Sequence, residues 1–161
     1  MRKRPMPPTP ETVVPQTEDW LDLEGVAVVE VTSEDKDFPV EAALVLGETR
    51  GWRAAEPGPQ TIRLLFDQPQ TIKRIALVFE EEEAVRTQEF VLRWSSDGGK
   101  RFREIVRQQW NFSPPATREV EEYRVELLDV TLLDLTIVPN ISGGAAHASL
   151  KGLRLSPGRM E

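Results

Sequence analysis

The sequence contains no cysteine, so a disulfide framework and a thiolate-bound zinc or iron–sulfur site are both excluded. It also has no apolar run approaching the roughly 20 residues of a membrane span, so membrane insertion is not expected. A single histidine leaves few acid–base pairs, and no Gly-x-Ser-x-Gly motif marks a nucleophile. We therefore expect a protein that is not an enzyme and needs no cofactor.

Positive charge is in the minority. The formal net charge is -7, which would repel the phosphate backbone of a nucleic acid and an anionic membrane, so neither is an expected partner. The basic residues at the start are followed by prolines instead of an apolar segment, so no secretory signal is predicted. The expected location is the cytoplasm, unless the chain is a fragment of a larger protein.

The length of 161 residues suits one domain with a sizeable core. Residues 1–18 are proline-rich and polar and show no hydrophobic periodicity, which is typical of a flexible arm or linker. We assign residues 19–161 to the folded domain. A second domain has no room.

Short runs with strand character begin at Gly25 and are separated by Gly, Pro, Asn or Asp. Apolar residues alternate with polar ones in several runs, as in a half-buried strand. The predicted strands are 26–31, 40–46, 60–66, 70–79, 88–95, 102–108, 119–128, 131–138 and 147–155. Helical turns are expected only near 17–23 and 47–55. About eight strands indicate an all-β fold, an antiparallel β-sandwich of the jelly-roll type.

The clearest local signal runs from Phe90 to Phe102, where an alternating strand enters an Asp-Gly-Gly turn and returns. If consecutive strands run antiparallel, alternate connections emerge at the same end of the sandwich. Tight turns at one end are predicted at 67–69, 96–100 and 128–131. Long connections at the other end are predicted at 47–59, 80–87, 109–118 and 139–146. Four long loops side by side can form a pocket, so we expect any binding site there.

The order of these segments resembles the discoidin family, also called the coagulation-factor type C or galactose-binding-like domain, over about residues 25–156. The matching segments are Trp52, Ile62–Ile72, Ile75–Leu77, Gln88–Leu92, Ser95–Gly99, Phe102 and Ala148–Leu155. The resemblance implies an eight-stranded jelly roll whose loops bind ligands at one end, often sugars and sometimes lipids or proteins, usually without catalysis.

Two positions depart from the family pattern. Many members hold calcium with an Asp before the Trp-containing loop and a Glu in the last strand. Here those positions correspond to Leu46 and to Lys151 or Gly152. Since calcium needs about six to eight oxygen ligands, we expect no metal there.

A sugar site combines an aromatic ring with planar groups that hydrogen-bond to hydroxyls. The candidate ligand-binding residues at the long-loop end are Arg53, Arg86, Trp110, Asn111, Asn140 and His147. Trp52 is a further aromatic, but the family pattern favours a core role for it. The acidic run 80–83 is interpreted as a solvated loop, because adjacent side chains point in different directions.

Two functions remain open from the sequence. One is a non-catalytic module that binds a carbohydrate or another small ligand through the long loops. The alternative is an intracellular protein-interaction or scaffold domain that uses the same loops, with the proline-rich arm as a tether.

Overall fold

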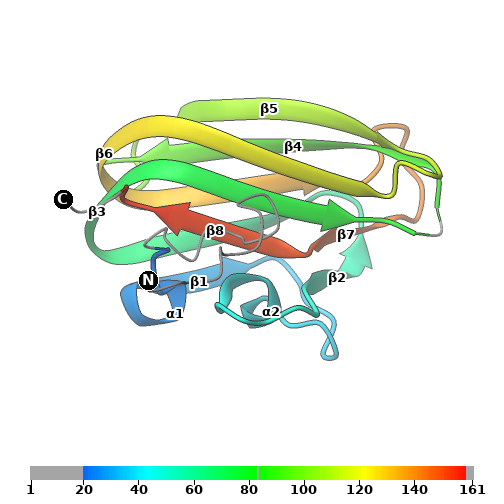
Figure 1. Cartoon of the computed structure of the whole chain (residues 1–161), viewed down its shortest axis with the longest axis horizontal. Helices are drawn as coiled ribbons and strands as arrows, with labels where there is room; N and C mark the ends of the chain where they lie inside the picture. The colour runs from blue at the N-terminus through cyan, green and yellow to red at the C-terminus, as the bar shows by residue number, and fades with distance from the viewer. Residues whose placement is uncertain (1–19, 83, 159–161) are drawn as a thin grey trace, which may run out of the picture.

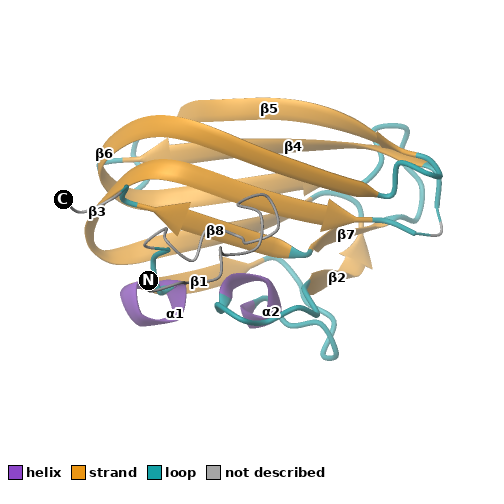
Figure 2. Ribbon diagram, viewed as in Figure 1, coloured by secondary structure: helices purple, strands orange, loops and turns teal. Residues whose placement is uncertain are grey.

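The computed structural model describes residues 20–82 and 84–158 as an antiparallel β-sandwich (Figure 1). The predicted arm at 1–18 lies outside the described residues. In chain order the elements are α1 (Leu23–Val26), β1 (Ala27–Val31), α2 (Glu41–Leu44), β2 (Trp52–Pro57), β3 (Gln60–Glu80), β4 (Arg86–Ser95), β5 (Arg103–Phe112), β6 (Arg118–Val138), β7 (His147–Leu150) and β8 (Gly152–Ser156). Figure 2 shows that strands dominate, as predicted for an all-β fold.

A folded ribbon of two long strands forms the centre of the sandwich. β3 and β6 pair antiparallel from Gln60–Ile137 to Glu80–Arg118, and the register shifts between Leu65 and Arg74 where the ribbon folds over. The first half of β3 and the second half of β6 share a layer with β1, β4 and β5. The other halves form the second layer with β8. Figure 1 shows both strands curving round the left-hand end from one layer to the other.

Alternate residues of the ribbon fill the space between the layers. Ile62 and Leu64 come from the first half of β3, and Leu77 and Phe79 from the second half; each is at most 1% exposed. Phe79 packs across the sandwich on Phe90 of β4, with ring centroids 5.2 Å apart. The two-residue period in the sequence therefore predicts the buried face correctly on both sides of the fold.

Two local predictions are wrong. The segment 40–46 is not a strand, because α2 spans Glu41–Leu44 and buries Ala42, Ala43 and Leu44 in succession, which the alternating faces of a strand do not allow. Pro39 precedes the turn, and its carbonyl accepts a hydrogen bond from the Ala42 N–H at 3.0 Å. Alanine and leucine both favour helix over strand.

The second wrong prediction is the helical turn near 47–55. β2 begins there at Trp52, and its first residues alternate between buried and exposed. The predicted strands 60–66 and 70–79 are also one strand, β3, as are 119–128 and 131–138 in β6. The segments 67–70 and 128–131, where tight turns were predicted, instead form the bend of the ribbon, and both strands continue through it without a reversal.

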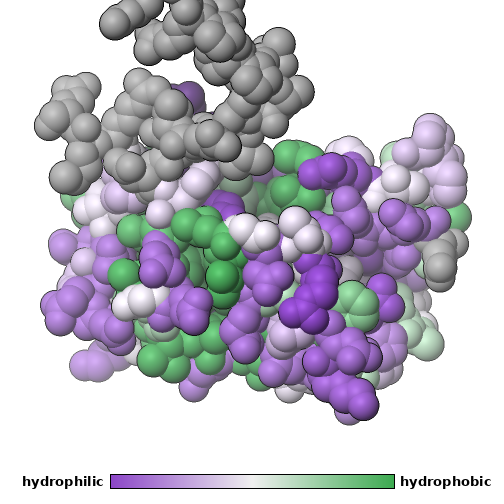
Figure 3. Space-filling view, turned by 60° about the horizontal axis from the view of Figure 1, so that its bottom comes forward, coloured by the Kyte–Doolittle hydropathy of each residue, from purple (hydrophilic) through white to green (hydrophobic). Residues whose placement is uncertain are grey.

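The helices are minor elements. α1 and α2 span four residues each, so no helix in the described part of the chain could cross a membrane. Figure 3 shows the face that carries these helices and β1, where hydrophilic residues surround one apolar area. Among the large apolar residues of this region, Val28 and Leu46 are exposed.

A buried carboxylate ties three strands together on the outer face of the larger layer. Asp134 of β6 is completely buried and accepts hydrogen bonds from Arg93 Nε at 3.1 Å and Arg93 Nη2 at 2.8 Å. Arg63 of β3 approaches the same carboxylate at 3.4 Å. Both guanidinium groups lie over the Phe102 ring. The cluster therefore fixes the 96–102 turn against the sheet.

We expect the substitution Asp134→Asn to lower the free energy of unfolding by about 1–3 kcal/mol, because it removes charge-assisted hydrogen bonds without changing the side-chain volume. Urea denaturation measures this loss. Glu30→Gln, at an exposed position of β1, is the control and should leave the midpoint unchanged. An unchanged midpoint for Asp134→Asn would show that the cluster does not stabilise the fold.

Candidate functional site

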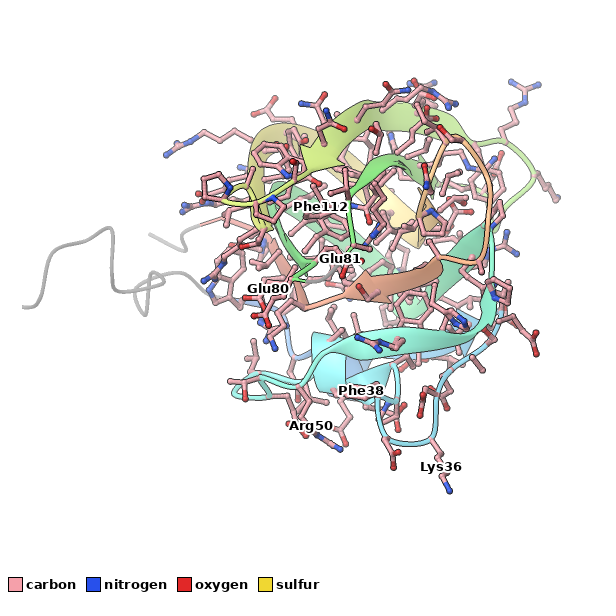
Figure 4. All side chains as sticks on the ribbon, turned by 90° about the vertical axis from the view of Figure 1, so that its right-hand side faces the viewer. Lys36, Phe38, Arg50, Glu80, Glu81 and Phe112 are labelled. Atoms are coloured by element: carbon pink, nitrogen blue, oxygen red, sulfur yellow. The ribbon has the colours of Figure 1, made fainter. Side chains whose placement is uncertain are left out.

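The long connections meet at one end of the sandwich, as predicted. The Glu81 N–H donates to the Thr117 carbonyl at 2.8 Å, the Ile141 N–H to the Thr87 carbonyl at 2.9 Å, and the Gly58 N–H to the Ala146 carbonyl at 3.2 Å. β4 and β5 place Gln88 opposite Trp110, so the loops that flank these strands are neighbours. This end lies at the right of Figure 1 and faces the viewer in Figure 4.

Two adjoining hollows open at this end, with volumes of about 290 and 400 Å³. They share Arg53, Glu80, Glu81 and Ser149, and we call them together the loop-end cleft. In Figure 4, Glu80 and Glu81 lie on one side of the short strands β2 and β7, and Phe38 and Arg50 lie on the other. The cleft is thus lined by the end of β3, by the β2–β7 pair and by the 35–38 loop.

The pairing of β2 with β7 determines which side chains face the cleft. Trp52 lies opposite Leu150, and both are 1% exposed, so their neighbours Arg53 and Ser149 point the other way. The Trp52 indole N–H donates to the Ser33 carbonyl at 3.0 Å, which confirms the core role expected for this residue. Gly51 has φ 80°, and a Cβ there would lie 2.7 Å from the Leu150 carbonyl oxygen, so the two strands approach this closely only with glycine.

Arg53 presents an unpaired guanidinium to the cleft. Its Cζ atom lies 5.2 Å from the centroid of the Phe38 ring, which is cation–π geometry. Within the described residues, no carboxylate or carbonyl group accepts a hydrogen bond from the guanidinium. The stacked ring restricts the side chain while leaving its donors available, so Arg53 is suited to bind a planar or multidentate acceptor.

Two acidic residues of the cleft, Glu80 and Glu81, are paired with cations. Glu80 lies 3.7 Å from Lys151 Nζ and 3.9 Å from Arg118 Nε. The Arg86 Nε–H donates to Glu81 Oε1 at 2.7 Å. The sequence interpretation of 80–83 as a solvated loop missed this role, because it depends on contacts with residues distant in sequence.

Burial gives Arg86 an internal role. The side chain is 2% exposed, and Arg86 Nη1 donates to the Pro139 carbonyl at 2.7 Å and to Gln88 Oε1 at 3.2 Å. Gln88 in turn donates to Glu119 Oε1 at 3.3 Å across the sandwich. The Arg86 donors in these bonds point inward, so the residue supports the cleft from below.

Glu119 is a completely buried carboxyl group at the inner end of this network. Burial raises its pKa to about 8, and the neighbouring Glu121 carboxyl adds to the increase. The carboxyl group is therefore protonated at neutral pH. Its burial away from the cleft gives it no access to a bound ligand.

The other predicted residues fall into two places. His147 lines the larger hollow beside Arg53, with its Nδ1 atom 3.0 Å from the Ala54 carbonyl oxygen. Trp110 packs partly buried against the core, whereas the Asn111 and Asn140 side chains each bond to a neighbouring residue. Asn111 accepts a hydrogen bond from the Thr87 hydroxyl, and Asn140 accepts one from the Ser142 N–H at 3.1 Å. None of these three lines either hollow of the cleft.

The described residues contain no group of three or more histidine, aspartate or glutamate side chains arranged to hold a metal ion. At the positions discussed for calcium, Leu46 is exposed and Lys151 forms the ion pair with Glu80.

No family model and no curated protein matches the chain. Solved structures do. A family 32 carbohydrate-binding module from C. perfringens NanJ, in complex with galactose, has a TM-score of 0.64 at 14% identity, over 84% of this chain and 96% of that chain. A second module, CpGH89CBM32-5 from Clostridium perfringens with GalNAc-β-1,3-galactose, has a TM-score of 0.62 at 20% identity, over 85% and 99%.

A third is the CBM32 of AlyQ in complex with 4,5-unsaturated mannuronic acid, with a TM-score of 0.59 at 17% identity, over 81% of this chain and 94% of that chain. At such identities the likeness establishes the arrangement of the backbone. The two layers, the strand order and these matches agree, and the chain has the galactose-binding-like, discoidin-type β-sandwich fold.

Proposed function

We propose that the protein is a non-catalytic carbohydrate-binding module and that the loop-end cleft holds the sugar. The observation that carries the proposal is the unpaired Arg53 guanidinium, stacked on Phe38 and placed between the two hollows. The solved modules of the same fold that bind galactose and GalNAc-β-1,3-galactose support it.

The proposed mechanism uses direct hydrogen bonds to sugar hydroxyl groups. Arg53 donates two bonds to adjacent hydroxyl oxygens, Ser149 donates or accepts one, and the Glu81 carboxylate accepts one. His147 borders the larger hollow and contacts a substituent of the sugar ring. Glu81 is bonded to Arg86 and therefore keeps its position when a ligand enters.

The absence of catalysis is part of the same proposal. Glu80 and Glu81, which line the cleft, are both ion-paired with cations that hold their carboxylates in place. Glu119, whose pKa burial raises to about 8, lies buried below the cleft. We expect a bound glycan to be recovered unchanged.

The substitution Ser149→Trp tests the location of the site. Ser149 lines both hollows, so a tryptophan fills the cleft without entering the core. A glycan array identifies a sugar that wild-type protein binds, and calorimetry then measures its affinity. We expect Ser149→Trp to weaken that binding at least about 30-fold with an unchanged melting temperature.

Ser142→Trp is the matched control, because Ser142 is exposed in the 139–146 loop and lines neither hollow. It should retain wild-type affinity, as should Asn111→Ala. Undiminished binding by Ser149→Trp would exclude the cleft as the site. A wild-type protein that binds no glycan would overturn the carbohydrate proposal itself.

A further inference from the structure

The charges around the loop-end cleft are distributed unevenly. Besides Arg53, the Arg and Lys side chains that line the two hollows are Arg50 and Lys151, and each has an anionic partner, as do the neighbouring Arg86 and Arg118. Lys151 and Arg118 are paired with Glu80, Arg86 with Glu81, and Arg50 with Glu48 at 3.8 Å. Arg50 also donates to the Asp37 carbonyl at 3.2 Å. Arg53 has no anionic partner among the described residues, and its guanidinium group contacts the π face of the Phe38 ring instead.

The unpaired Arg53 guanidinium group, stacked on the Phe38 ring, is preorganised to bind an anion. A carboxylate accepts two parallel N–H bonds from an arginine fork, and such charge-assisted bonds are about twice as strong as those to a neutral hydroxyl group. Stacking on Phe38 reduces the rotamer freedom that Arg53 would otherwise lose on binding. A neutral sugar would offer the Arg53 fork no charged acceptor.

The opposite side of the cleft suits the rest of a sugar ring. Glu81 and Glu82 line the smaller hollow together with Arg53, and their carboxylates only accept hydrogen bonds, whereas sugar hydroxyl groups donate them. Glu82 and Asp35 repel an anion that approaches them, so they favour the orientation in which the acidic group of the ligand faces Arg53.

We propose that the cleft selects a sugar that carries a carboxylate, a uronic acid, and that Arg53 binds this carboxylate in bidentate geometry. The inference rests on the proposed function and adds the ligand class. Arg53 is thus a specificity-determining residue: it distinguishes an acidic sugar from the neutral sugar of the same stereochemistry.

Two matched pairs of sugars test the proposal by isothermal calorimetry and by chemical-shift titration of the whole chain. The pairs are galactose with galacturonic acid, and glucose with glucuronic acid; within each, the C6 hydroxymethyl group is replaced by a carboxylate. We expect the acid of at least one pair to bind about tenfold more tightly or better than its neutral partner. The preference should decrease between 20 and 300 mM salt, roughly as screening of a partly exposed charge requires.

The variant Arg53→Gln should abolish the preference for the acid, with a smaller effect on the neutral partner and no change in melting temperature, because the side chain is exposed. Arg50→Gln is the control: it lines the smaller hollow, but its cation is already paired, so the preference should change less than about threefold.

Equal affinity for the acid and the neutral sugar, or a preference that survives Arg53→Gln, would overturn the inference while leaving carbohydrate binding intact. Absence of binding by both members of both pairs would also overturn it if the glycan array shows binding of other, neutral sugars. Absence of binding throughout the array would overturn the proposed function with it.

Discussion

Replacement of Arg86 by methionine should lower the free energy of unfolding by about 3–5 kcal/mol. The guanidinium group is almost completely buried and donates to Glu81, to Gln88 and to the Pro139 carbonyl. Methionine fills a similar volume but removes all of these bonds, and a buried acceptor that loses its donor is costly. Chemical denaturation monitored by tryptophan fluorescence measures the loss.

Arg107→Met is the matched control. Arg107 also bonds to two acidic residues, Glu89 and Glu104, but on the exposed surface of β5. Water replaces exposed ion pairs readily, so the unfolding midpoint should stay at the wild-type value. The contrary result is an Arg86→Met variant that is as stable as Arg107→Met and fails to bind the ligand. That result would make Arg86 a ligand-binding residue, as its position in the sequence predicts.

The second large effect is a loss of stability as the pH rises. In the unfolded chain Glu119 ionises near 4.5, whereas burial raises its pKa to about 8 in the folded protein. Between these values the folded state holds a proton that the unfolded state has released, so stability falls with increasing pH and levels off above about 8. At roughly 1.4 kcal/mol for each pH unit, Glu119 can account for a loss of up to about 5 kcal/mol.

The variant Glu119→Gln isolates this contribution. Glutamine resembles the protonated carboxyl group and keeps an acceptor for Gln88, but it does not ionise. Unfolding free energies at pH 5, 7 and 9 should show similar stability of both proteins at pH 5 and a clear advantage of the variant at pH 9. Glu126→Gln, at an exposed position of the same strand, should follow the wild type. Parallel curves for wild type and Glu119→Gln would show that Glu119 is not protonated in the folded state at neutral pH.

The sequence predicts the layers of this fold well because alternation is a local property. Ile62 and Leu64, or Leu77 and Phe79, show which side of a strand faces the core without any knowledge of its partners. The sequence shows less clearly whether a strand continues or ends. Polar residues at 67–70 have the composition of a turn, yet β3 passes through them because β6 continues to pair on the other side. A bend in a paired ribbon and a reversal of the chain look alike in one sequence.

The candidate site, like the fold, is predicted only in part by the sequence. The loops were expected at a common end, and Arg53 and His147 do lie together there. Arg86 was predicted as a ligand-binding residue of the long loops; its side chain is buried, and Glu81 and Gln88 accept its hydrogen bonds internally. The role of Glu80 in the cleft depends on its ion pairs with Lys151 and Arg118, which the fold brings together from distant segments.

The fold in the β3–β6 ribbon lies at the pole of the molecule opposite the loop-end cleft (Figure 1). Its apolar packing and the cleft therefore draw on different parts of the chain. Directed evolution can exploit this separation: randomising the 35–38 loop, which contributes Asp35 and Phe38 to the cleft, would vary the site while the bend of the β3–β6 ribbon stays untouched. Variants selected to bind a new glycan should then keep a melting temperature close to that of the wild type.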